Sequence, residues 1–211
     1  MKGLIEHSLK GLARIDRKRT AVLAVHWQVD AVKPEGILGP TFAAMVADTG
    51  VIARTVSVVA AARAAGMPII HVRVCYWPGH ADLVRNNALF NAVAEKNGFV
   101  RGTRGAQFIE ELQPAERDFV VEHSRISSFH GSDLVSVLAA RNIETIVVTG
   151  IATNVAVDHT VRDAVQLGYN VILLEDCCCS SSKAHHEAAL LTLRVLATEV
   201  AGAQRFIDAI G

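Results

Sequence analysis

Short apolar runs alternate along the chain with longer stretches in which apolar positions recur at helical spacing. Runs rich in Val and Ile predict strands at residues 21–26, 68–75, 118–121, 145–150 and 170–175, with a weaker one at 199–201. The stretches between them predict helices at residues 42–65, 132–141, 155–167, 185–196 and 204–210. Strands that are apolar on both faces are typical of a parallel sheet covered by helices. The alternation therefore predicts an α/β fold, a three-layer, doubly wound, mainly parallel sheet of about six strands with helices on both faces.

A single domain over residues 1–211 is expected, because the sequence contains no internal repeat, low-complexity tract or interdomain linker. The length also suits one hydrophobic core. Residues 1–19 precede the first predicted strand and are interpreted as an N-terminal extension or helix. The long stretch 76–99 is interpreted as a lid or a partner-contacting loop.

Composition narrows the class of protein. The 21 Lys and Arg residues balance the 21 Asp and Glu residues, which argues against nucleic acid or an anionic membrane as the main partner. No apolar run has the length of a membrane span, and the first residues lack the apolar core of a secretory signal. Three of the four cysteines are consecutive, which suits reduced thiols better than a disulfide framework. A cytoplasmic location is therefore expected.

Ligands of an open parallel sheet bind beyond the carboxyl ends of its strands. The most informative segment at that edge is GIATNVA, residues 150–156, where a strand ends at Gly150 and a helix begins near Thr153 or Asn154. Ala156 then falls in the first helical turn, where free N–H groups favour an anion or oxyanion. A cysteine at this place would have a lowered pKa and be a good nucleophile, but the sequence has alanine. Residues 26–30, 75–80, 122–126 and 176–180 are expected at the same edge.

Five segments together resemble the isochorismatase-like hydrolases, the superfamily of isochorismatases, nicotinamidases and related cysteine amidohydrolases. The segments are TAVLAVHWQVD at 20–30, RGTRGAQFIEELQP at 101–114, EHSRISSF at 122–129, TGIATNVAVDHTVRDA at 149–164 and EDCCCS at 175–180. The resemblance extends over about residues 20–210. It implies the isochorismatase-like fold, a small-molecule substrate and a homo-oligomer, either a dimer or a tetramer.

The resemblance also implies a catalytic triad of aspartate, lysine and cysteine, and this sequence departs from all three. His26 stands where the aspartate belongs, His123 where the lysine belongs and Ala156 at the position of the lost nucleophile. The resemblance implies that the aspartate and the lysine form a partly buried ion pair. Removing one member of such a pair would destabilise the fold by ~3–5 kcal/mol, and replacing both members avoids this cost. Two neutral imidazoles can still form one hydrogen bond, which favours a rebuilt site.

A histidine-based hydrolase acting on a small polar molecule is the first hypothesis. One of His26 and His123 would be the general base for a water, and the other would orient it or donate a proton, with activity governed by ionisation near ~6.5. The amides around Ala152 and Ala156 would hold the oxyanion. Gln28 would bind a substrate carbonyl or a water, or else be a structural amide that ties the strand end. Trp77 would stack on a flat substrate or pack against a neighbouring subunit.

Other interpretations stay open. The protein could be a catalytically inactive pseudoenzyme that binds a small molecule or a partner, with His26 and His123 only filling polar space. Alternatively, His26 and His123 could hold a metal together with Asp30 or His71. These four residues are scattered along the sequence and lack the short spacing of many metal motifs, so neither a metal nor a cofactor is expected. Cys177 or Cys179 could also replace the nucleophile. Ala156 could itself be an engineered substitution, which would explain one of the three departures.

Overall fold

The structure, a computed structural model, describes residues 12–211. Most of the extension or helix predicted at residues 1–19 therefore lies outside the described residues. In the described part of that stretch, Leu12–Arg14 forms a single 3₁₀ turn.

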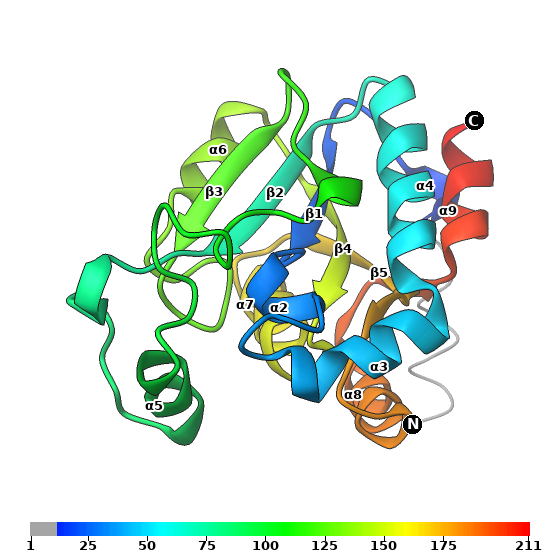
Figure 1. Cartoon of the computed structure of the whole chain (residues 1–211). Helices are drawn as coiled ribbons and strands as arrows, with labels where there is room; N and C mark the ends of the chain where they lie inside the picture. The colour runs from blue at the N-terminus through cyan, green and yellow to red at the C-terminus, as the bar shows by residue number, and fades with distance from the viewer. Residues whose placement is uncertain (1–11) are drawn as a thin grey trace.

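One six-stranded sheet forms the centre of the molecule (Figure 1). Its strands are β1 (Thr20–Val25), β2 (Ile69–Val74), β3 (Phe119–His123), β4 (Thr145–Ile151), β5 (Asn170–Cys179) and β6 (Glu199–Ala201). They follow the order β3-β2-β1-β4-β5-β6, and every neighbouring pair is parallel. The chain therefore starts in the middle of the sheet and winds outward in both directions, as the sequence predicts.

Helices cover both faces of the sheet. The helices of the described residues are α2 (Val29–Val32), α3 (Gly39–Thr49), α4 (Val51–Ala64), α5 (Ala88–Glu95), α6 (Leu134–Ala140), α7 (Asp158–Gln166), α8 (Lys183–Leu196) and α9 (Ala203–Ile210). Buried residues of α3, α4 and α9 form one core cluster with one face of the sheet. Buried residues of α6, α7 and α8 form a second cluster with the other face. All six residues of β1 are buried between these two clusters, so the sheet is apolar on both sides, and the predicted three-layer fold is confirmed.

Several element boundaries differ from the prediction. The single helix predicted at 42–65 is two helices, because Gly50 adopts a left-handed conformation with φ of 63° between α3 and α4. β5 continues to Cys179, four residues past its predicted end. The helix predicted from residue 155 begins as a π-helical turn at Thr153–Val157 and becomes α-helical at Asp158.

The end of β4 comes very close to β1. A Cβ atom at Gly150 would lie 2.4 Å from the carbonyl oxygen of Val25, so only glycine fits there. This close approach brings the turn after β4 beside the residue that follows β1. That residue is His26.

In the described part of the chain, no single helix is long and apolar enough to cross a membrane. The bent pair α3 and α4 meets the length and composition criteria together, with an angle of 68° between the two helices.

Candidate functional site

Two buried histidines face each other at the carboxyl edge of the sheet. His26 directly follows β1, and His123 is the last residue of β3. Their Nε2 atoms lie 2.6 Å apart, and their rings stack with centroids 4.8 Å apart and an interplanar angle of 20°. Two residues that are far apart in the sequence are thus brought into direct hydrogen-bond contact.

The surroundings of the pair favour neutral imidazoles. Burial lowers the pKa of His26 well below its usual value, the nearby charge of His123 would lower it further, and the backbone of Ile151 opposes the shift. Burial also lowers the pKa of His123 to about 4, against a smaller raising effect of the Ser127 backbone. Both rings are therefore neutral at pH 7, and the ionisation expected near ~6.5 moves to lower pH.

A neutral pair in this geometry shares one proton. Because the two Nε2 atoms face each other, one ring must carry its hydrogen on Nε2 and donate it, while the other ring accepts and carries its hydrogen on Nδ1. Among the described residues, Nδ1 of His123 is buried and forms no hydrogen bond of good geometry, although the backbone of Ser127 is close enough to raise the pKa of the ring. Within residues 12–211, no carboxylate pairs with either ring to balance the positive charge that protonation would create.

A cavity of about 90 Å³ lies against His26. Ala152 and Ala156 line the same cavity, as the predicted edge of the sheet requires. Most of the remaining wall is apolar. Part of it comes from the stretch 76–99, for which the sequence predicts a lid or a partner-contacting loop, and which contributes Leu89, Phe90, Val93 and Phe99. An apolar wall excludes water and strengthens any electrostatic interaction made inside.

Arg125 is the charged residue in the cavity wall, and sequence reasoning did not select it. Its guanidinium carbon lies 5.1 Å from the centre of the Phe90 ring. The phenol of Tyr76 also lines the cavity; burial and Asp82 raise its pKa, while the positive charge of Arg125 opposes that shift. Arg125 stands two residues after His123, inside the segment 122–126 that was placed at this edge, so its position was the available signal.

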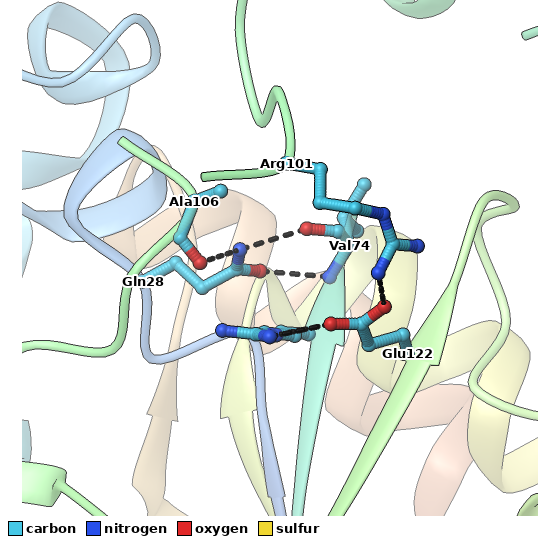
Figure 2. A network of polar contacts seen from close by, with 6 residues as sticks. Gln28, Val74, Arg101, Ala106 and Glu122 are labelled. Carbon is cyan, nitrogen blue, oxygen red and sulfur yellow. Dashed lines mark hydrogen bonds and ion pairs between the residues drawn. The ribbon is translucent and has the colours of Figure 1, made fainter. Parts of the chain in front are cut away.

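Gln28 is fully buried and bonded to the backbone on all sides. Its Nε2 donates to the carbonyl oxygens of Val74 at 2.8 Å and Ala106 at 3.0 Å, while its Oε1 accepts from the N–H of Val74 at 2.8 Å (Figure 2). These bonds tie the chain after β1 to the end of β2 and to the loop around Ala106. These bonds favour the interpretation of Gln28 as a structural amide that ties the end of the strand. Gln28 does not line the cavity.

Trp77 lies outside the cavity wall. Its side chain is 55% exposed, and the guanidinium carbon of Arg101 lies 4.6 Å from its ring centre. Arg101 also binds the carboxylate of Glu122, which Figure 2 shows beside the Gln28 bonds. The predicted contact of Trp77 with substrate or a neighbouring subunit stays a prediction.

Of the four candidate metal ligands, His71 and Asp30 do not join the pair of His26 and His123. The Nε2 of His71 lies 3.2 Å from a carboxylate oxygen of Asp118. The carboxylate of Asp30 accepts from the N–H groups of Phe99 at 2.7 Å and Ile37 at 3.3 Å. Within residues 12–211, no three His, Cys, Asp or Glu side chains converge in a way that would hold a metal ion. The alternative metal cluster of His26 and His123 with Asp30 or His71 therefore has no geometric basis.

Burial favours the protonated thiol form of the three consecutive cysteines at neutral pH. Burial raises the pKa of Cys177 to about 12, with Asp176 adding to the shift, and burial alone raises the pKa of Cys179 to about 12. Burial also raises the pKa of Cys178 well above its usual value. A thiol that stays protonated is a poor nucleophile, so neither Cys177 nor Cys179 is a suitable replacement for the missing cysteine.

Comparison with known proteins gives consistent similarities. Residues 20–205 match the model of the isochorismatase domain. The chain is 36% identical over 165 residues to the ureidoacrylate amidohydrolase RutB of Cronobacter turicensis, covering 72% of this chain and 71% of that protein. A RutB of Variovorax paradoxus is 39% identical over 139 residues, which cover 60% of this chain and 55% of the relative. A cysteine hydrolase structure from Pseudomonas syringae pv. phaseolicola has a TM-score of 0.83 at 31% identity, covering 93% of this chain and 94% of that one.

Proposed function

Because the chain belongs to the isochorismatase family, we propose that it is a hydrolase in which a pair of neutral histidines, and no cysteine, activates water. The observation that carries the proposal is the 2.6 Å contact between the Nε2 atoms of His26 and His123 beside the cavity. The family resemblance assigns these two positions to an aspartate and a lysine, and Ala156 to the cysteine. All three replacements then form one rebuilt site.

His26 is the group that meets the water. It lines the cavity, and its Nε2 is engaged with His123, so Nδ1 is the ring nitrogen left for the backbone of Ile151 and for a molecule in the cavity. In the productive tautomer, the Nε2–H of His26 donates to Nε2 of His123. This leaves a lone pair on Nδ1 of His26 for a proton from water, and the backbone of Ile151, which raises the pKa of His26, stabilises the ring once that proton is bound.

His123 positions and supports the base. Its Nδ1 then carries a hydrogen, which the raising effect of the Ser127 backbone on its pKa favours. When Nδ1 of His26 takes a proton, the Nε2–H of His26 can move to Nε2 of His123, so the positive charge is shared between the two rings. His123 is therefore a positioning residue and a second acceptor in a short relay.

The reaction is the hydrolysis of an amide-type C–N bond. The water oxygen bonds to the carbonyl carbon while its proton passes to His26, and a tetrahedral oxyanion forms. Backbone amides around Ala152 and Ala156 stabilise that oxyanion without needing a side chain. When the intermediate collapses, the C–N bond breaks and the leaving nitrogen takes the proton back from the histidine pair. The name of the RutB relatives, amidohydrolase, supports this bond type.

A cytoplasmic homo-oligomer, either a dimer or a tetramer, belongs to the same proposal. Its support is the family resemblance and the balanced charge of 21 basic and 21 acidic residues. Light scattering at micromolar concentration tests the assembly, and a monomer at all concentrations would contradict it.

The experiment is a turnover assay on short N-acyl and ureido compounds, with released ammonia or amine as the readout. We expect wild-type turnover and a loss of about 100-fold or more in kcat for both His26→Ala and His123→Ala. His185→Ala is the matched control, because His185 is exposed at the start of α8 and outside the site. Unchanged kcat in both site variants would refute the histidine mechanism. Binding of these compounds without any turnover would support the pseudoenzyme alternative.

A further inference from the structure

Arg125 differs from the other arginines near the site in having no acidic partner. Arg73 and Arg101 both bind the carboxylate of Glu122. In the part of the chain that the structure describes, Arg125 forms no ion pair or hydrogen bond, and its guanidinium carbon stacks on Phe90 at 5.1 Å from the ring centre. A half-buried guanidinium has lost part of its hydration, so an anion that restores its hydrogen bonds is strongly favoured.

Arg125 also stands at the boundary between two hollows. Together with Phe90 and Ile126, it lines both the apolar cavity and a more open polar groove. The acidic residue of that groove, Asp163, already pairs with His130 at 3.1 Å. Asp163 forms no ion pair with Arg125, so no carboxylate in the described walls of either hollow neutralises this guanidinium at ion-pair distance.

The polarity and the volume of the cavity indicate which kind of molecule Arg125 would bind. Apart from His26, Tyr76 and Arg125, the side chains of the cavity wall are apolar. The volume of about 90 Å³ is smaller than the roughly 150 Å³ of an engineered cavity that holds benzene. A body of about four carbon atoms is therefore expected between the two polar ends.

We infer that Arg125 is the receptor for a substrate carboxylate, and that the substrate is a short carboxylic acid whose hydrolysable amide group lies toward His26 and Ala156. The guanidinium binds the carboxylate through two N–H groups, the apolar wall encloses the short chain, and the opposite end reaches the histidine pair. The position of the amide rests on the proposed function. Carboxylate binding by Arg125 does not, because it requires no turnover.

The test measures binding of an isosteric pair, butanoate and butanamide, by ligand-observed nuclear magnetic resonance. The wild type should bind butanoate about tenfold more tightly than butanamide, because the charge-assisted bonds are lost with the amide. Arg125→Met should abolish that preference, and Arg125→Lys should keep part of it. Arg117→Met is the control, because Arg117 is exposed and lines neither hollow.

Three results would overturn the inference. They are equal affinity of the wild type for the two probes, an unchanged preference in Arg125→Met with circular dichroism equal to wild type, and no binding of butanoate up to about 50 mM. His26→Ala separates this inference from the proposed hydrolysis. This variant should retain the preference for butanoate although its turnover is lost. In the wild type, a preference for butanoate without turnover of any assayed amide would refute the histidine mechanism and leave carboxylate binding by Arg125 standing.

Discussion

Two buried histidine clusters belong to the same sheet and differ in their charged partners. In the first, His71 of β2 lies 3.2 Å from Asp118, whose carboxylate also binds Arg63 at 2.5 Å. In the second, His26 and His123 meet each other at 2.6 Å, and no carboxylate of the described residues pairs with either ring. In the first cluster, the carboxylate of Asp118 pairs with the guanidinium of Arg63. The second cluster has no such ion pair and lies beside a cavity.

The pKa shifts follow the same division. Burial lowers the pKa of His71, but the hydrogen bond to Asp118 and its charge oppose the shift. For His26, burial and the charge of His123 act in the same direction. Burial therefore does not distinguish a functional histidine from a structural one. The difference lies in whether the ring has a fixed counter-charge or is left to exchange a proton with a bound molecule.

The largest expected effect is on turnover. His26→Ala should lower kcat by about 100-fold or more, because general base catalysis contributes that much. His71→Gln sharpens the comparison, since glutamine can still donate to Asp118 and the site is untouched; its kcat should stay within about twofold. Steady-state kinetics of both variants measure the contrast. An equal loss in the two variants would mean that the clusters are not functionally distinct.

The next effect is on the pH dependence of stability. The folded pKa of His123, about 4, is lower than the unfolded value of ~6.5, so the unfolded chain binds the extra proton between these values. The free energy of unfolding therefore rises from about pH 4 to 6.5, and His123 contributes about 3 kcal/mol that is present above pH 6.5 and lost as the pH falls.

Urea denaturation at pH 7 and pH 4.5 measures this linkage. His123→Gln removes the titrating ring, so its stability should fall less than that of the wild type between these two pH values. Carboxylates titrate in both proteins, and their contribution cancels in the difference. Parallel losses in the wild type and His123→Gln would show that His123 does not ionise in this range.

A smaller effect is expected in the charged cluster. Burial raises the pKa of Asp118, but Arg63, the N–H of Ala115 and His71 together lower it below its usual value. Asp118→Asn should therefore destabilise the fold by about 2 kcal/mol, a value reduced because Arg63 is partly exposed. Thermal or urea denaturation measures the change, and kcat should be unaffected. A loss of turnover without a loss of stability would contradict the structural assignment.

The smallest effect is expected at Glu122, next to His123 on β3. Its partners Arg73 and Arg101 are partly exposed, so Glu122→Gln should cost about 1 kcal/mol. The bonds of Gln28 in Figure 2 do not involve Glu122 and should hold the end of β2 as before. The preference for butanoate over butanamide should also remain. A lost preference would mean that Glu122 helps to place Arg125.

The sequence predicts the sheet well because its strands are apolar on both faces. It misses the break at Gly50, because apolar periodicity continues on both sides of that residue and a left-handed glycine leaves the pattern intact. It also ends the fifth strand early, although Cys177, Cys178 and Cys179 are as buried as the apolar residues before them.

The candidate site was partly predictable. The edge rule and the resemblance together place His26 and His123 near each other, because parallel strands end at the same edge. They do not identify Arg125, because its special property is the lack of an acidic partner. That property depends on where acids from distant segments lie, and Glu122 and Asp163 are both taken by other groups.

The central claim is that His26 and His123 form a neutral pair at physiological pH. Nitrogen-15 nuclear magnetic resonance of the imidazole rings tests it directly, with His26→Ala and His123→Ala to assign the signals. Both rings should stay neutral as the pH falls from 8 to about 5, with His123 titrating near about 4. An imidazolium signal from either ring at pH 7 would contradict the account.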